Sequence, residues 1–268
     1  MKKATTNNNF IGKRSQNSKM EVHHHPRVEK KNFKGYFLEF LMIFLAVTLG
    51  FFAENIRESI NDKTKIKSSV RSMIADLQSD VNMYNATILI NKLSDRRIDT
   101  LISLLKLDRS NTSRIYFLAR YATANNNIYT PDTKTFDQMK SSDALKLIDS
   151  RKVADSISDY YQSLQFFISQ SDLQRQKVVD VHLVNSQLFD GYVFQQMFTR
   201  VERNLDVEIT QPENNPPLLS EDFNAINKVM IAYHYLYGTT EINTKAAEEI
   251  RQHALRLIEL LKNEYHLG

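Results

Sequence analysis

The chain has 268 residues, with no cysteine, no tryptophan and only six glycines. The missing cysteines exclude disulfide scaffolds, thiolate metal sites and cysteine nucleophiles. Sheets with tight turns and nucleotide-binding loops need glycine where φ is positive or where backbone approaches a ligand closely. Because average usage would give roughly 19 glycines, the composition predicts an all-α fold.

The formal net charge of +4 is divided unevenly along the chain. Residues 1–34 hold nine Lys or Arg and two Glu, whereas residues 54–268 hold 26 basic and 28 acidic residues. A weakly acidic domain does not favour nucleic-acid binding, which needs cations clustered on one face. A basic segment beside an apolar one is typical of contact with an anionic membrane leaflet. We therefore predict that residues 1–34 form a disordered tail. The cations expected to contact anionic lipid are Arg27, Lys30, Lys31 and Lys34.

Residues 35–54 are predicted to form a transmembrane helix. The run FLMIFLAVTLGFFA, from Phe40 to Ala53, carries no charge, and extending it back to Tyr36 adds only Glu39. Eighteen helical residues span about 27 Å, close to the roughly 30 Å of a bilayer's hydrocarbon core. A signal peptide is disfavoured because the apolar core of a signal peptide is shorter than this run. A buried core helix is disfavoured because this run has no polar face to contact water. The span is expected to include Tyr36, Phe40, Phe44, Gly50 and Ala53, with the lipid bilayer as partner.

Three small residues, Ala46, Gly50 and Ala53, fall on one face of this predicted helix. Small residues at such spacing let two membrane helices approach closely, so a helix–helix contact in a homodimer is one interpretation. The heptad-like stripe that follows is equally compatible with a coiled coil and with a seam inside a helical bundle. Both alternatives stay open.

Three segments resemble a known family. They are MEVHHHPRVEKKNFKGYFLEFLMIFLAVTLGFFAENIRESI at 20–60, TFDQMKSSDALKLI at 135–148 and LIELLKNEYHLG at 257–268. Together they resemble the DUF6090 family, single-pass membrane proteins of unknown function from Bacteroidetes. The resemblance implies a bacterial membrane protein with a helical C-terminal region, and it carries over no catalytic residue, ligand or partner. It also makes Met20 an alternative translation start to Met1.

The cations that flank the span predict its orientation. Within ten residues the N-terminal side has four Lys or Arg and the C-terminal side has two, although within twenty residues each side has five. By the positive-inside rule this favours a cytoplasmic N-terminus. We expect a signal anchor in the bacterial inner membrane, with the C-terminal domain in the periplasm.

The remainder of the chain is predicted to be a helical bundle. Residues 55–109 form a long juxtamembrane helix, because apolar residues recur every three or four positions between Ile66 and Ile88 and again between Ile98 and Leu105. Residues 110–211 form the middle part of the domain. The helices predicted in this middle part cover residues 114–122, 142–148, 152–185 and 186–203.

Residues 212–268 are predicted to form a C-terminal helical hairpin of the same domain. A proline-containing linker at 210–219 precedes it, and Ser220 with the acidic residues after it marks a helix start. We expect two helices, 220–236 and 241–265, separated at Gly238.

Residues with catalytic or metal-binding potential are sparse. His23, His24 and His25 could bind a transition metal, but a polar basic tail is the simpler interpretation. Glu249 and His253 are four residues apart, whereas the carboxylate-bridged di-iron motif needs three. No P-loop, G-x-S-x-G or H-E-x-x-H motif occurs. We therefore predict no enzyme activity, no cofactor and no metal site.

Two functions remain open from the sequence. The first is a membrane-anchored structural or interaction protein that binds itself or another membrane or envelope protein. The second is an extracytoplasmic ligand-binding or sensory module. Such a module would act through a partner protein, because the chain shows one span and no signalling output. No nucleic-acid partner is expected.

Overall fold

The computed structural model describes residues 32–124, 131–200 and 207–267. Its elements in chain order are α1 (Phe33–Leu107), α2 (Thr112–Ala124), α3 (Lys134–Ser141), the 3-10 helix η1 (Ala144–Leu147), α4 (Arg151–Asn185), α5 (Gly191–Gln196), β1 (Phe198–Arg200), β2 (Val207–Ile209) and α6 (Phe223–Tyr265). Helices dominate the described residues, which confirms the predicted all-α fold.

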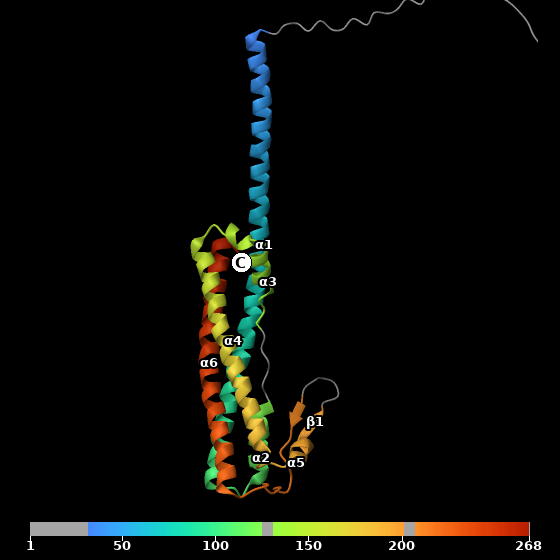
Figure 1. Ribbon diagram of the computed structural model, residues 1–268, viewed down its shortest axis with the longest axis vertical. Helices are drawn as coiled ribbons and strands as arrows, with labels where there is room; N and C mark the ends of the chain where they lie inside the picture. The colour runs from blue at the N-terminus through green and yellow to red at the C-terminus, as the bar shows by residue number, and fades with distance from the viewer. Residues whose placement is uncertain (1–31, 125–130, 201–206, 268) are drawn as a thin grey trace, which may run out of the picture. The chain divides into compact units, whose positions relative to one another are not determined.

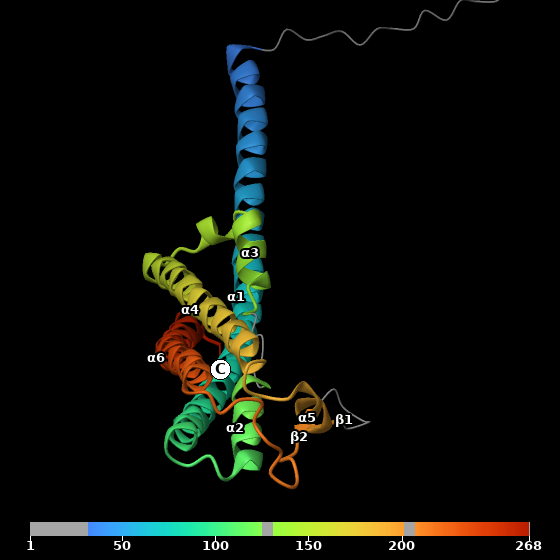
Figure 2. The ribbon, with the colours of Figure 1, turned by 60° about the horizontal axis from the view of Figure 1, so that its bottom comes forward.

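The chain divides into two units, one ending at Arg57 and one running from Glu58 to Gly268. In the first unit the described part is essentially the apolar start of α1. The second unit holds the rest of α1 and all later elements. Within it, α1 and α4 run in one direction and α6 runs in the opposite direction (Figure 1). Figure 2 shows α2 beside the end of α1, and α5 with the two strands at the side of the bundle.

The second unit contains two hydrophobic cores. The first core joins α1 between Ile66 and Ile88 to the first half of α4 and the second half of α6. The stripe of α1 predicted from the sequence lies in this core, where Val70, Met73 and Leu77 are fully buried. Burying each such side chain contributes about 1.5–3 kcal/mol relative to exposure, so this stripe fixes which face of α1 turns inward.

The second core lies further along α1 and adds α2. Ile98, Leu101 and Leu105 of α1 pack there with α2, with Val178 and Val181 of α4 and with the start of α6. The helix predicted to end at residue 109 ends at Leu107, before a polar segment in which the Asp108 carboxylate accepts a hydrogen bond from the Ser110 backbone N–H at 2.9 Å. An Asx turn of this kind competes with the helix for backbone groups.

The predicted C-terminal hairpin is wrong, because α6 is one continuous helix that passes through Gly238. Its start agrees with the sequence: Asp222 caps it by accepting a hydrogen bond from the Ala225 backbone N–H at 3.0 Å. A glycine inside a helix costs about 1 kcal/mol relative to alanine. Leu236 and Ala247, buried on either side of Gly238, outweigh that cost.

The predicted helix over residues 186–203 is also wrong. The chain leaves α4 at Asn185, forms only the six-residue α5, and then pairs β1 with β2 in antiparallel register, Phe198 opposite Ile209. The break occurs at Asp190, whose side chain accepts from the Tyr192 backbone N–H at 2.8 Å and whose own N–H donates to the Tyr116 hydroxyl at 2.9 Å. A tertiary contact therefore interrupts a segment that local periodicity assigned to a helix.

The segment 142–148 is a single 3-10 turn, η1, and not the predicted α-helix. Asp143 has a left-handed backbone with φ of 55°, which cannot continue a helix from α3. The helix predicted at 152–185 is confirmed as α4.

Candidate functional site

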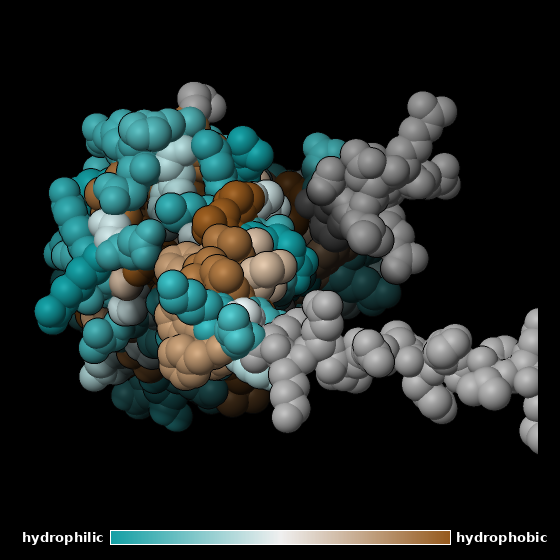
Figure 3. All heavy atoms as spheres, turned by 90° about the horizontal axis from the view of Figure 1, so that it is seen from above, coloured by the Kyte–Doolittle hydropathy of each residue, from teal (hydrophilic) through white to brown (hydrophobic). Residues whose placement is uncertain are grey.

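The described part of the first unit is an apolar helix with mostly exposed side chains. An 18-residue window of α1 near the N-terminus is long and apolar enough to cross a membrane, and none of it is buried. Phe40, Phe44 and Leu49 are 63%, 54% and 65% exposed. In Figure 3, which looks onto the start of α1, brown hydrophobic side chains are uncovered there. The helix therefore lacks the burial that a core helix of a water-soluble bundle would show.

Polar groups in and beside this window are paired along the helix itself. The Thr48 hydroxyl donates to the Phe44 carbonyl at 2.7 Å. At the end of the window the Arg57 Nε donates to the Glu54 carboxylate at 3.0 Å. A segment placed in lipid must satisfy its polar groups internally, so these pairs suit an apolar surrounding.

The residues predicted for the membrane span lie along this exposed helix. Tyr36 is 57% exposed, and a Cβ added to Gly50 would meet no heavy atom within 4 Å. Ala46 and Ala53 are exposed as well, so the helix–helix contact stays a prediction. Lys34 is exposed in the first turn of α1. Two groups of predicted residues lie outside the described residues: the lipid-binding cations Arg27, Lys30 and Lys31, and the histidines His23, His24 and His25.

The first core contains a buried carboxylate, Asp80, which is only 3% exposed. Its oxygens accept hydrogen bonds from the Tyr160 hydroxyl at 3.1 Å and from the Asp132 backbone N–H at 3.2 Å. The Tyr160 hydroxyl also lies 3.0 Å from the Tyr84 hydroxyl. This network joins α1, α4 and the chain before α3, and it provides the hydrogen bonds that a buried charge requires.

Between the two cores lies a central polar layer, formed by Asn91 of α1, Ser171 and Gln174 of α4, and Asn243 of α6. Gln174 donates to the Asn91 side-chain oxygen at 3.1 Å and accepts from the Asn243 side-chain amide at 2.7 Å. The same Asn243 amide lies 3.2 Å from the Ser171 hydroxyl. Asn91 and Asn243 are 4% and 2% exposed. Three helices are thus linked by side-chain amides where a bundle of this kind usually has apolar side chains.

Asp95 lies one helical turn after Asn91, beside this layer. Burial, followed by the nearby carboxylates Glu241 and Asp99, raises the pKa of Asp95 to about 7. The Asp99 carboxylate also raises the pKa of Tyr237, with smaller effects of Glu241 and Asp95. An acidic cluster between α1 and α6 therefore holds one carboxyl group that titrates near neutral pH.

The second core holds its own hydrogen-bonded tyrosines. The fully buried Tyr233 hydroxyl donates to the Ala119 carbonyl at 2.9 Å and accepts from the Asn185 amide at 3.0 Å. Burial raises the pKa of Tyr233 well above its ordinary value. The Tyr116 hydroxyl donates to the Pro217 carbonyl at 3.0 Å, which attaches the proline-containing connection to α2. Tyr233 is buried in this core, as Tyr160 and Tyr161 are in the first.

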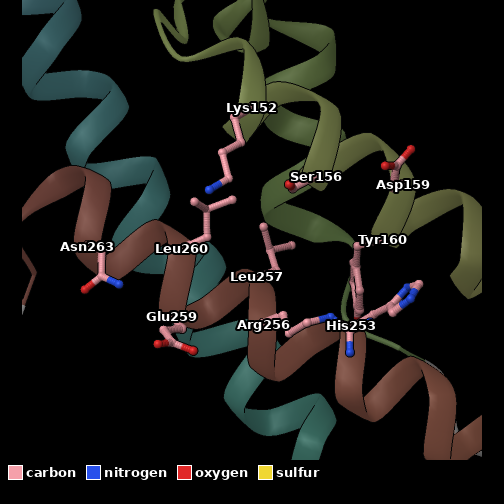
Figure 4. A pocket seen from close by; sticks show the side chains of 10 residues that line it. All are labelled: Lys152, Ser156, Asp159, Tyr160, His253, Arg256, Leu257, Glu259, Leu260 and Asn263. Carbon is pink, nitrogen blue, oxygen red and sulfur yellow. The ribbon is translucent and has the colours of Figure 1, made fainter.

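A groove of about 470 Å³ lies between α4 and α6 along the outside of the first core (Figure 4). It is lined by Lys152, Ser156, Asp159, Tyr160, His253, Arg256, Leu257, Glu259, Leu260 and Asn263. Its charged side chains are exposed to solvent, two basic and two acidic. The Tyr160 hydroxyl is engaged by Asp80 inside the core, so the groove has no buried polar group free for chemistry.

Among the described residues, no group of three or more His, Asp or Glu side chains is placed to hold a metal ion. Comparison with protein-family models, with curated proteins and with solved structures finds no match for this chain. The resemblance to the Bacteroidetes family therefore stays a prediction.

The sequence did contain a signal for the buried polar residues. The apolar stripe of α1 continues with the same spacing of three and four from Ile88 through Asn91 and Asp95 to Ile98. Asp80 stands on the same stripe. Polar residues at consecutive core positions of a bundle mark a polar layer, whereas this interval looked like the end of one stripe and the start of another.

Proposed function

We propose that the chain is a membrane-anchored helical protein that binds a protein partner through its bundle. The observation that carries the proposal is the uncovered apolar window of α1. Transfer of each large apolar side chain from water to an apolar medium is worth about 1.5–3 kcal/mol. Lipid is the surrounding that this segment fits best.

The bundle supports a binding role by its closed interior. Both cores are filled by apolar side chains and by tyrosines, of which Tyr84, Tyr160 and Tyr233 have hydrogen-bonded hydroxyls. A partner would therefore bind on the outer surface, as in other helical interaction modules. A second copy of the chain, brought close by shared anchoring, is one such partner, and another membrane or envelope protein is the other.

We propose the bacterial inner membrane as the location, with the N-terminus in the cytoplasm and the bundle in the periplasm. Support comes from the cations on the N-terminal side of the span and from the family resemblance. A reporter that is active only in the cytoplasm, fused after residue 268, should be inactive. The same reporter fused before residue 1 should be active, and the reverse pattern would overturn the orientation.

The anchor itself is tested by fractionation. The full chain should remain with the membrane pellet after an alkaline carbonate wash and should dissolve in mild detergent. A fragment of residues 58–268 should stay in the aqueous fraction. Cross-linking in intact membranes, followed by mass spectrometry, then identifies the partner as a second copy or another protein. Recovery of the full chain in the aqueous fraction would contradict the proposal.

A second function, binding of a small polar ligand, is favoured by the groove between α4 and α6. Its lysine and arginine could contact an anionic group, with Leu257 and Leu260 beneath. Raised thermal stability of the full chain with one member of a panel of anionic metabolites, lost in Lys152→Ala with Arg256→Ala, would support it. We propose no enzyme activity, because the groove brings no activated nucleophile beside a base.

A further inference from the structure

Asn91 and Asp95 of α1 divide the bundle into its two cores. The first core ends on α1 at Ile88 and the second begins at Ile98. At this level the three long helices contact one another through the central polar layer. The two cores therefore have no continuous apolar packing along α1.

The polar layer leaves several of its buried atoms without hydrogen bonds. Among the described residues, the Asn91 Nδ2, the Asn243 Oδ1 and one Asp95 carboxylate oxygen are buried and have no partner. A buried polar atom without a partner destabilises the arrangement that buries it. A change of charge at this level therefore acts on a helix contact whose hydrogen bonding is already incomplete.

The charges around Asp95 are mainly negative. Asp99 follows it by one turn on its own helix, and α6 contributes the Glu241 carboxylate. Lys245 pairs with Glu241 at 3.2 Å, and Lys92, one turn before Asp95 on α1, pairs with Glu248 of α6 at 2.7 Å. The other groups near this level are Tyr237 of α6 and the neutral Gln174 of α4. Arg97 of α1 stacks on the ring of Tyr121 at 3.8 Å.

We propose that Asp95 and the central polar layer form a proton-operated switch between the two cores. With Asp95 protonated, α1 and α6 face each other across one neutral carboxyl group, and the second core packs against the layer. Loss of the proton places three carboxylates at the α1–α6 contact, beside amide groups that lack partners. Repulsion then moves α6 away from α1 at the second core, while the first core keeps its packing.

The burial and the carboxylates that set the pKa of Asp95 near 7 place the transition close to neutral pH. The switch goes beyond the proposed function and does not depend on membrane anchoring, because all its residues lie in the second unit. A partner bound at the second core would shift the same equilibrium to the extent that it prefers one of the two states.

The absence of cysteine allows a direct test on the full chain in detergent. One spin-labelled pair, Ser103→Cys with Lys228→Cys, reports on α1 and α6 at the second core. A matched pair, Ser68→Cys with Glu259→Cys, reports on the same helices at the first core. All four positions are exposed. Distances are measured by double electron–electron resonance between pH 5.5 and pH 8.5.

We expect the second-core distance to lengthen and broaden with a midpoint near pH 7, while the first-core distance stays constant. The substitution Asp95→Asn should hold the second-core pair in its low-pH distribution at all pH values. Asp159→Asn, an exposed carboxylate of α4, should leave the transition unchanged. An unchanged second-core distance in the parent chain, or a pH response that survives Asp95→Asn, would overturn the switch. Circular dichroism of each labelled variant over the same pH range shows that it is folded.

Discussion

At the scale of single residues, Asp80 and Tyr233 show how the protein pairs polar groups in its interior, although buried atoms without a partner also occur away from the polar layer, at Asp76, Tyr161 and Asn185. Asp80 has two donors, and Tyr233 has one donor and one acceptor. These pairings specify how the helices face each other, since an apolar core alone tolerates many arrangements.

Removing the Tyr233 hydroxyl should be costly. In Tyr233→Phe the buried Asn185 amide loses its acceptor and the Ala119 carbonyl loses a donor, so the free energy of unfolding should fall by about 1–3 kcal/mol. Denaturant titration of the full chain in detergent, followed by circular dichroism, measures the change. The control is Tyr235→Phe, where the ring is 61% exposed and the loss should be negligible. Equal losses in both variants would refute the role of the buried pair.

Asp95 should make stability depend on pH in the direction opposite to most carboxylates. Its pKa is raised from 3.8 in the unfolded chain to about 7 in the folded one, so the folded state binds more protons between these values. Its contribution to stability is complete below about pH 4, declines as pH rises, and levels off above about pH 7. Because the group is partly exposed, we expect Asp95→Asn to be more stable than the parent by about 1–2 kcal/mol at pH 8.

The measurement for Asp95 is the difference between the two unfolding free energies from pH 4 to pH 8. In that difference the contributions of the other carboxylates to the pH dependence cancel. One of them is Asp180, whose pKa is lowered by hydrogen bonds from Lys177 and Gln176 and whose effect on stability has the opposite sign. A difference that is constant with pH would show that Asp95 does not titrate in this range.

At the scale of elements, the long helices were predictable and the short elements were not. The stripe from Ile66 to Ile88 and the pattern of α4 extend over many turns, so periodicity identifies them. The strands have three residues each, too few for any period, and they pair next to a turn fixed by the tertiary contact of Asp190 with Tyr116. In α6, Gly238 was interpreted as a break between two helices, although the apolar residues on both sides of it belong to one continuous helix.

The continuity of α6 gives a simple prediction at Gly238. The glycine is helical, and an added Cβ would meet no atom within 4 Å. Gly238→Ala should therefore raise the free energy of unfolding by about 0.5–1 kcal/mol, since alanine has less conformational freedom to lose. Gly238→Pro should lower it by about 3 kcal/mol or more, because proline removes a helical hydrogen bond. A thermal melt that drops in the alanine variant would show that the chain needs a break there.

At the scale of the whole molecule, the apolar window of α1 exposes its side chains, whereas the bundle buries its apolar side chains in two cores. The window was predictable from its run of uncharged residues, which is long and apolar enough to cross a membrane. The central polar layer was not predicted. A single sequence shows a polar residue on an apolar stripe, but it does not show that three helices meet at that residue.

Two arginines in the middle of the window should abolish membrane association. Each of Leu45→Arg and Leu49→Arg costs about 2.5–3.5 kcal/mol at the centre of a span, so the double variant should leave the membrane fraction. Ile56→Arg with Ile60→Arg makes the same chemical change after the window and should leave the protein in the membrane pellet. Immunoblots of carbonate-washed fractions compare the two. Retention of the Leu45 and Leu49 double variant in the pellet would argue that lipid is not what covers the helix.

The distribution of the tyrosines has a practical consequence. Tyr84, Tyr160 and Tyr161 are buried in the first core, and Tyr116 and Tyr233 are buried in the second, in a chain without tryptophan. Fluorinated tyrosine would give each half of the bundle its own set of resonances. During heating, coincident loss of both sets would mean one cooperative unit, and separate losses would mean two domains that melt independently.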